Sequence, residues 1–378
     1  MAGAQATASV QAESDARWMR LAIGLGARML GRVWPNPAVG CVIVRDGVVV
    51  GRGWTAAGGR PHAETRALER AGDAARGATA YVSLEPCAHH GQTPPCIDAL
   101  IAAGVARVVT ALTDPDPRVA GRGHAALRAA GIAVTEGVEA EAAQAVQAGF
   151  LCRVTRGRPR VVLKLALTLD GRIATADGES RWITGPEARR AVHALRARSD
   201  SVLVGAGTAL ADDPELTVRD LGTNWQPVRV VLDSRLRLSP DSRLGRSATA
   251  VPLWMCHGVG APEPARAAWS RAGARLIACA GDASGQVSAA DALVQLGEAG
   301  LTRVLCEGGG VLAASLLRAG LVDEVVTIAA GKALGGDARP AVDALGLARL
   351  DAAPQLRLLE ARPVAGDLLA RWEVVREG

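Results

Sequence analysis

Four residues that suit metal and proton chemistry lie close together in the first third of the chain. A single alanine separates His62 from Glu64, and two cysteines, Cys87 and Cys96, follow. One imidazole and two thiolates suit Zn²⁺, and three protein ligands leave its fourth tetrahedral position open for water. Zinc lowers the pKa of that water, and a carboxylate that is not a ligand can carry its protons. The pattern therefore predicts a catalytic zinc site with His62, Cys87 and Cys96 as ligands and Glu64 as the proton carrier.

Prolines place both halves of this pattern at helix starts. In mid-helix, residues two apart point to opposite sides, so His62 and Glu64 could not share one target there. Pro61 instead predicts that His62 lies at the mouth of a helix over Ala63–Ala71, with Glu64 in its first turn. A proline pair before Cys96 likewise predicts a helix start, where the helix dipole favours a thiolate.

The same residues allow other interpretations. A structural zinc site would need a fourth protein ligand, and here that ligand would have to be His89 or His90. The cysteines could also be scattered core residues. The two histidines could meet a phosphate or simply be solvated.

The spacing of the two cysteines separates this chain from most zinc deaminases. Those enzymes carry H-x-E followed by P-C-x-x-C, whereas eight residues rather than two separate Cys87 from Cys96. The runs HAE and LEPCAHHGQTPPC resemble the bifunctional deaminase/reductase family of bacterial riboflavin biosynthesis, which has this long spacing. The resemblance covers nearly the whole chain beyond about residue 14. It implies zinc-dependent hydrolytic deamination of 2,5-diamino-6-ribosylamino-4(3H)-pyrimidinone 5′-phosphate.

The resemblance also implies a fold and a substrate contact in the first half. Strands alternate with helices there, which predicts a layered α/β sheet, and a hairpin is expected across Asp46-Gly47. The family implies a cytidine-deaminase-like three-layer domain. It makes Asn36 a substrate contact, although by itself an Asn beside two prolines indicates only a turn.

The second half contains five short runs, KLALTLDGRIA, SRWIT, LADDP, VLDSR and EGGG. In this order they resemble the reductase half of the same family, which implies a dihydrofolate-reductase-like domain that uses NADPH to reduce the ribosyl group to ribityl. Glycine-rich turns before helices present N–H groups to phosphates, but the turns here lack the complete G-x-G-x-x-G motif. Gly331 and Ala333 depart from the family pattern, and we expect these two departures to touch no residue assigned to chemistry.

Individual contacts in the second half follow from the resemblance. Cofactor contacts fall on Ala166, Trp182, Thr208, Asp212, Ser234, Gly309, Gly310, Val311, Leu312, Ala313, Ala314 and Ser315. Substrate contacts fall on Ser180, Arg196, Leu216, Arg219 and Glu307.

Charged residues in this half suggest particular tasks. Guanidinium groups bind phosphate bidentately, so two arginines, Arg196 and Arg219, suit the sugar phosphate. Ser234 beside Arg235 suits the 2′-phosphate that distinguishes NADPH from NADH. The candidates for ribose ring opening and proton delivery are Lys164, Asp212 and Glu307.

Chain length and composition set the domain organisation. Single cores stop growing below 378 residues, so two domains are expected. We predict a disordered leader over residues 1–14, a zinc-dependent deaminase domain over 15–152, a linker over 153–159 and an NADPH-dependent reductase domain over 160–378. Neither a secretory signal nor an apolar run of membrane-spanning length is present, so the default expectation is a cytoplasmic enzyme. We expect a homo-oligomer, either a dimer or a tetramer.

The sequence allows two alternative functions to be compared with this one. A nucleic-acid-editing deaminase with a C-terminal binding module would need a basic, aromatic-rich groove. The chain has one Tyr, one Phe, a net charge of only +5 and no basic run, so we expect neither a nucleic-acid nor a membrane partner. A catalytically dead domain is the other alternative, and the intact candidate residues in both halves oppose it.

Overall fold

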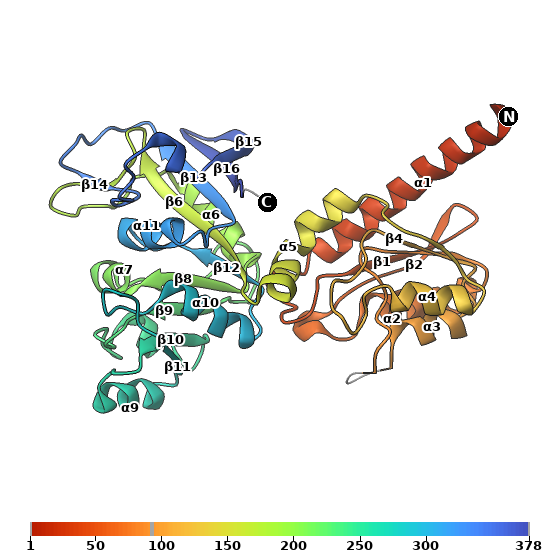
Figure 1. Ribbon diagram of the computed structural model, residues 1–378, viewed down its shortest axis with the longest axis horizontal. Coiled ribbons are helices and arrows are strands. Elements are labelled where there is room, and N and C mark those ends of the chain that lie inside the picture. Colours follow the sequence, from red (N-terminus) through yellow and green to blue (C-terminus); the bar gives the residue numbers. More distant parts are fainter. Residues whose placement is uncertain (1, 91–93, 377–378) are drawn as a thin grey trace. The chain divides into compact units, whose positions relative to one another are not determined.

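The computed structural model describes residues 2–90 and 94–376, so part of the LEPCAHHGQTPPC run (residues 91–93) lies outside the described residues. The chain divides into two compact units between Arg156 and Gly157 (Figure 1). In the described part of the chain, no helix has both the length and the apolar character needed to cross a membrane.

The first unit contains a five-stranded sheet in the order β2-β1-β3-β4-β5. Its strands are β1 (Gly40–Arg45), β2 (Val48–Trp54), β3 (Thr79–Val82), β4 (Arg107–Thr110) and β5 (Ala133–Thr135). Its helices are α1 (Ala2–Ala27), α2 (Ala63–Ala71), α3 (Cys96–Ala102), α4 (Arg122–Ala129) and α5 (Ala140–Arg156), with 3₁₀ turns η1 (Ala57–Gly59) and η2 (Gly72–Ala75). The hairpin β1–β2 is antiparallel across Asp46 and Gly47, both at positive φ, as predicted.

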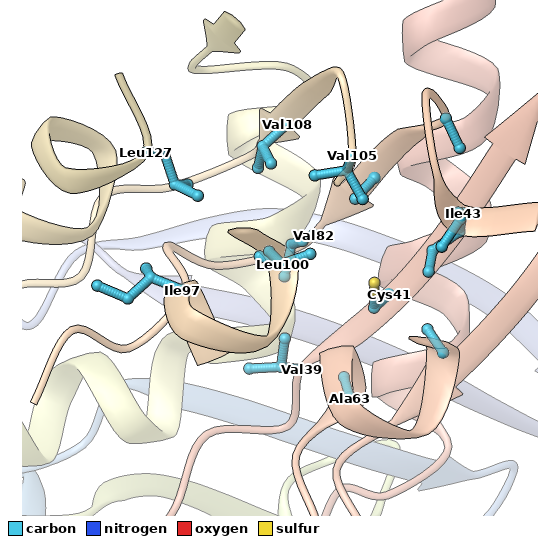
Figure 2. Packing of buried hydrophobic residues seen from close by; sticks show 14 of the residues in the cluster. Val39, Cys41, Ile43, Ala63, Val82, Ile97, Leu100, Val105, Val108 and Leu127 are labelled. Atoms are coloured by element: carbon cyan, nitrogen blue, oxygen red, sulfur yellow. The ribbon is translucent and has the colours of Figure 1, made fainter. Parts of the chain in front are cut away.

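Alternating side chains of the first sheet are buried on both faces. On β1, Cys41 and Ile43 enter the core beneath α2, α3 and α4 (Figure 2), whereas Val42 and Val44 pack with α1. Strands buried on both faces need helices on both sides. The predicted three-layer α/β/α domain is therefore confirmed.

Two expected boundaries differ from the structure. Helix α1 begins at Ala2, where we expected a disordered leader over residues 1–14. This stretch is rich in alanine and contains no proline, so it can continue the helix. Helix α5 continues through Arg156, so residues 153–156 are helical rather than part of a linker. Its basic last turn, with Arg153 and Arg156, suits the negative end of the helix dipole.

The second unit contains a nine-stranded sheet in the order β11-β10-β9-β8-β12-β6-β13-β16-β15. Its strands are β6 (Arg160–Thr168), β8 (Ser201–Gly205), β9 (Val228–Leu232), β10 (Leu253–Gly258), β11 (Arg275–Cys279), β12 (Arg303–Cys306), β13 (Glu324–Ala330), β15 (Leu356–Val364) and β16 (Asp367–Val374). A separate two-stranded sheet pairs β7 (Arg172–Ala174) with β14 (Arg339–Pro340). The helices are α6 (Pro186–Ala197), α7 (Ala206–Asp212), α8 (Arg243–Arg246), α9 (Glu263–Arg271), α10 (Ala289–Glu298) and α11 (Gly310–Arg318), with the 3₁₀ turn η3 (Leu350–Ala352).

Strand direction in this sheet determines where a site can form. The strands from β11 to β13 are parallel, whereas β16 pairs antiparallel with β13 and β15 pairs antiparallel with β16. Parallel strands bring their carboxyl ends to one edge, and ligands bind there in open α/β sheets. The loops after β8, β9 and β12 share this edge.

Candidate active sites

The three predicted zinc ligands converge in the first unit. The ligand atoms of His62, Cys87 and Cys96 all lie within 4.8 Å of one another. His62 Nδ1 is 3.3 Å from the Cys96 sulfur and 3.6 Å from the Cys87 sulfur. Two sulfurs and one imidazole nitrogen are a donor set that Zn²⁺ prefers, so these residues fit the metal.

A fourth protein ligand does not join this group. Among the described residues, the group of mutually close ligand atoms at this place is limited to the same three. His89 is half-buried with its Nδ1 lacking a hydrogen-bond partner, and His90 is exposed. This arrangement favours an open, catalytic type of zinc site over a closed structural one.

Helix starts position the ligands, largely as the prolines predicted. His62 is the N-cap of α2, and Glu64 lies in the first turn of this helix. Cys96 begins α3, but its backbone N–H donates to the Cys87 sulfur at 3.2 Å. Hydrogen bonding from the Cys96 thiol lowers the pKa of Cys87 to about 4 and raises the pKa of Cys96. The Cys96 N–H at the start of α3 thus stabilises negative charge on Cys87, and the thiolate expected at Cys96 stays a prediction for the metal-bound site, because a cysteine that binds Zn²⁺ does so as a thiolate.

Glu64 lies buried beside these ligands. Burial raises the pKa of the Glu64 carboxyl to about 7, and negative charge on Cys87 adds to this effect. A carboxyl group with a pKa near neutrality can both accept and donate a proton at physiological pH.

Two polar residues organise the loops around the first site. The carboxylate of Glu85, which the sequence analysis quoted in its motif without a role, accepts backbone N–H groups from Asp114, Gly121, Gly123 and His124 at 2.8–3.3 Å. It thereby fixes the loop after β4 next to the cysteine loop. A carboxylate directly before the Pro-Cys pair is a signal that could have indicated such a role.

Asn36 is half-buried in the loop after α1 and lies against the loop that precedes His62.

The second unit contains a cavity of about 1430 Å³ at the carboxyl edge of its sheet. Most of the residues predicted from the resemblance line it. They are Lys164, Ala166, Ser180, Trp182, Arg196, Thr208, Asp212, Leu216, Arg219, Ser234, Glu307, Gly309, Gly310, Val311, Leu312 and Ser315. Ala313 and Ala314 do not line it, because they face the core side of α11 and are fully buried.

A buried charge cluster lies in this cavity. The Glu307 carboxylate accepts hydrogen bonds from Nε and Nη2 of Arg196 at 2.6 and 3.0 Å, and Lys164 Nζ lies 3.6 Å from it. Burial opposes ionisation of Glu307, but Arg196 and Lys164 outweigh it and lower its pKa to about 2. Glu307 is therefore an anion held between two cations.

The two arginines expected to hold phosphate are engaged with carboxylates. The Arg196 guanidinium hydrogen-bonds the Glu307 carboxylate, because a buried carboxylate requires a countercharge. Nη1 of Arg196 also donates to the Thr217 carbonyl. Arg219 is exposed and pairs with Glu215. The sequence gives only a weak signal for the Arg196–Glu307 pair, because the two residues are 111 positions apart.

The glycine turn after β12 fits a phosphate-bearing cofactor. The backbone N–H of Gly309 donates to the Thr208 hydroxyl at 3.0 Å, which joins this turn to the one after β8. A Cβ on Gly310 would lie 2.6 Å from the Pro340 carbonyl oxygen, so only glycine allows this close approach of two loops. Strand, glycine turn and helix together present N–H groups to the cavity, as phosphate binding needs.

Arginines without a role predicted from the sequence line the same cavity as Ser234. The cavity lining includes Ser234, Arg237 and Arg243 but not Arg235. Nε of Arg237 is 3.8 Å from the buried Asp233 carboxylate. The Leu236 N–H donates to the Asp233 carbonyl and closes a turn just before Arg237. The Ser234 hydroxyl donates to Gln286 Oε1 and accepts the Val287 N–H, and Arg237 rather than Arg235 lines the cavity with it.

The loop over 330–336 contacts a predicted cofactor residue, Trp182, through Lys332. Lys332 Nζ donates to the backbone carbonyl of Trp182 at 2.7 Å. The Trp182 indole is exposed, and the Arg189 guanidinium lies over it at 4.5 Å from the ring centre. A long lysine side chain spans a distance that neither sequence separation nor motif spacing reveals.

Comparisons with known proteins agree with both sites. The model of the cytidine and deoxycytidylate deaminase zinc-binding region matches residues 12–112, and the model of the RibD C-terminal domain matches residues 159–370. The solved RibD structure from Acinetobacter baumannii is 38% identical, with a TM-score of 0.86 and coverage of 97% of this chain and 100% of that one. A Thermotoga maritima structure titled diaminohydroxyphosphoribosylaminopyrimidine deaminase/5-amino-6-(5-phosphoribosylamino)uracil reductase is 34% identical, with a TM-score of 0.84 and the same coverage.

Curated relatives cover nearly the whole chain as well. The riboflavin biosynthesis protein RibD of Escherichia coli is 44% identical over 94% of this chain and 98% of its own length. That of Aquifex aeolicus is 40% identical over 85% and 88%. None of these names favours the nucleic-acid-editing alternative. The chain therefore belongs to the RibD family, the zinc- and NADPH-dependent deaminase/reductase enzymes of riboflavin biosynthesis.

Proposed function

We propose that the chain catalyses two successive reactions on one pyrimidine. The first unit removes the amino group of 2,5-diamino-6-ribosylamino-4(3H)-pyrimidinone 5′-phosphate by hydrolysis. The second unit then reduces the ribosyl group of the product to ribityl. The observation that carries the proposal is the convergence of His62, Cys87 and Cys96 beside the buried Glu64, in a chain that also has a charged cavity at the edge of a second sheet.

In the first site, the residues divide into metal holders and a proton carrier. His62, Cys87 and Cys96 would hold Zn²⁺, which when bound supplies a Lewis acid that makes water nucleophilic near neutral pH. Glu64 would accept a proton from the water and donate it to the departing amine, because its carboxyl can take either protonation state. Asn36 would read the edge of the pyrimidinone with an amide that both donates and accepts hydrogen bonds.

In the second site, the charge cluster would drive opening of the sugar ring. NADPH supplies the hydride when it is bound. Lys164 would donate a proton to the ring oxygen as the ribosylamine opens, while Glu307 faces it as an anion and Asp212 lines the same cavity. Because Arg196 is engaged by Glu307, its proposed task becomes holding this carboxylate, and Arg219 remains the candidate for the substrate phosphate.

Selection of NADPH over NADH would depend on Arg237 in this site. We expect Arg237→Ala to weaken binding of 2′,5′-ADP about tenfold, because a charge-assisted hydrogen bond to the 2′-phosphate is lost. Binding of 5′-AMP should stay unchanged, and Arg235→Ala is the matched control for removing a neighbouring exposed arginine. Titration calorimetry of both nucleotides checks this. Equal effects of the two substitutions on 2′,5′-ADP binding would remove Arg237 from the proposal.

Assembly into a homo-oligomer is supported by the outer hairpin of the second sheet. Edge strand β15 exposes Leu356, Leu358 and Leu359, and β16 exposes Leu368. An apolar edge strand is a natural surface for another copy.

We further propose that the enzyme works in the cytoplasm.

We expect Leu358→Asp to shift the chain toward a smaller species, because it places a charge on this apolar edge. Light scattering after size-exclusion chromatography measures the mass. Leu350→Asp is the control, since Leu350 is exposed outside the hairpin. An unchanged mass for Leu358→Asp would exclude the hairpin as the contact.

The overall proposal is tested by following ammonia release and NADPH oxidation together on the zinc-loaded protein, with NADH as a control. Both activities with a preference for NADPH are expected. Ammonia release without reduction would limit the function to the first unit. Absence of both would mean that the substrate is wrong.

A further inference from the structure

The loop that leads into His62 is closed by its own backbone. The Ala56 N–H donates to the Pro61 carbonyl at 3.0 Å, and the Gly59 N–H donates to the Ala56 carbonyl at 2.9 Å. Gly59 is buried and has a φ of 88°, a left-handed conformation that favours glycine. The loop therefore holds Gly59 in a fixed place three residues before His62.

The side chain of Asn36 fills the space that a side chain on Gly59 would need. A Cβ on Gly59 would lie 1.8 Å from Asn36 Nδ2, 2.6 Å from its Cγ and 3.0 Å from its Cβ. The Gly58 N–H donates to the Arg32 carbonyl at 2.8 Å, which ties the loop to the segment that carries Asn36. The Asn36 carboxamide thus packs directly on the bare backbone of Gly59.

We infer that Gly59 is a positioning residue of the deaminase site. Because it lacks a side chain, Gly59 lets the Asn36 carboxamide lie beside the loop that delivers His62 to the start of α2. Gly59 thereby sets where the pyrimidine edge is read relative to the ligand that holds the metal. This inference rests on the proposed function, in which Asn36 contacts the pyrimidine.

The neighbouring glycine provides a matched control for the test. Gly58 also has a positive φ, 76°, but no heavy atom lies within 4 Å of a Cβ built on it. Gly58→Ala therefore strains the backbone as Gly59→Ala does, without displacing Asn36. We expect Gly59→Ala to raise the KM for ammonia release about tenfold or more, because small misplacements of substrate-positioning groups are costly. Zinc content should stay at the wild-type level, and Gly58→Ala should leave the KM unchanged.

A double-mutant cycle shows whether Gly59 acts through Asn36. In an Asn36→Ala background the two closest approaches disappear, and only the 3.0 Å approach of Cβ remains. Gly59→Ala should then add little to the KM increase caused by Asn36→Ala. Additive effects, or equal KM changes in the two glycine variants, would overturn the inference. If Gly59→Ala alone failed to fold, recovery of folded protein in the double variant would support the clash, and its failure to recover would count against it.

The same measurements separate this inference from the proposed function. Absence of ammonia release from the wild-type chain would contradict the function itself. Normal wild-type release with an unchanged KM in Asn36→Ala would remove the substrate contact of Asn36, and the inference with it. If wild-type release is normal, and the KM changes in Asn36→Ala but not in Gly59→Ala, the inference is overturned while the proposed function stands.

Discussion

Glu64→Gln is expected to lower ammonia release by about 10²–10⁴-fold, the usual contribution of a positioned acid–base group. Glutamine preserves the size and polarity of the side chain but cannot exchange a proton. The three metal ligands are untouched, so zinc content, measured by atomic absorption, should remain at the wild-type level. The expected defect is therefore in turnover and not in metal binding.

Two controls belong with this substitution. Glu69→Gln changes an exposed carboxylate on the same helix, α2, and should leave ammonia release unchanged. NADPH oxidation by Glu64→Gln should be normal when the deaminated pyrimidine is supplied. Ammonia release near the wild-type rate in Glu64→Gln would exclude Glu64 as the proton carrier.

Glu307→Gln is expected to destabilise the second unit by about 3 kcal/mol at pH 7, because it leaves the largely buried Arg196 and Lys164 side chains without their counter-anion. Hydrogen exchange of peptides from α6 and β12 reports on this unit specifically. Glu298→Gln, which changes an exposed carboxylate on α10, is the control and should have little effect.

The stability difference between wild type and Glu307→Gln should depend on pH in a definite direction. The folded-state pKa of Glu307, about 2, lies below its ordinary value of 4.5, so ionised Glu307 stabilises the fold above the ordinary value. This shift corresponds to about 3 kcal/mol, which is lost as the pH falls from about 4.5 to about 2. The stability difference between wild type and Glu307→Gln should therefore shrink over that range. A difference independent of pH would mean that charge is not the reason for the destabilisation.

Local signals predicted local structure well. Asp46 and Gly47 specify a hairpin turn whatever surrounds them, and Pro61 with His62 marks the start of α2 because a helix start depends on neighbouring residues. The leader was mispredicted because its residues 2–14 fit two states. Their alanine content permits a helix, but only the continuation into the packed part of α1, around Met19 and Ala22, decides for it.

Partners distant in sequence limited what could be predicted about the sites. The convergence of His62, Cys87 and Cys96 was predictable because a metal demands particular atoms, whatever the spacing between them. The Cys96 backbone N–H at the start of α3 donates to the Cys87 sulfur, and no residue pattern reports this contact. The engagement of Arg196 by Glu307, and the placement of Arg237 rather than Arg235 in the cavity, likewise result from tertiary packing.

The chain contains only two lysines among its 43 basic Lys and Arg residues, and both lie at the reductase cavity. Lys164 lines the cavity, and Lys332 holds the backbone of Trp182, which also lines it. Reagents that acylate amines do not modify arginine, so apart from the terminal amine they can mark only these two positions. Lysine acylation, read by mass spectrometry, is therefore a direct footprint of what occupies the reductase cavity, and the first unit apart from its terminal amine serves as an internal blank.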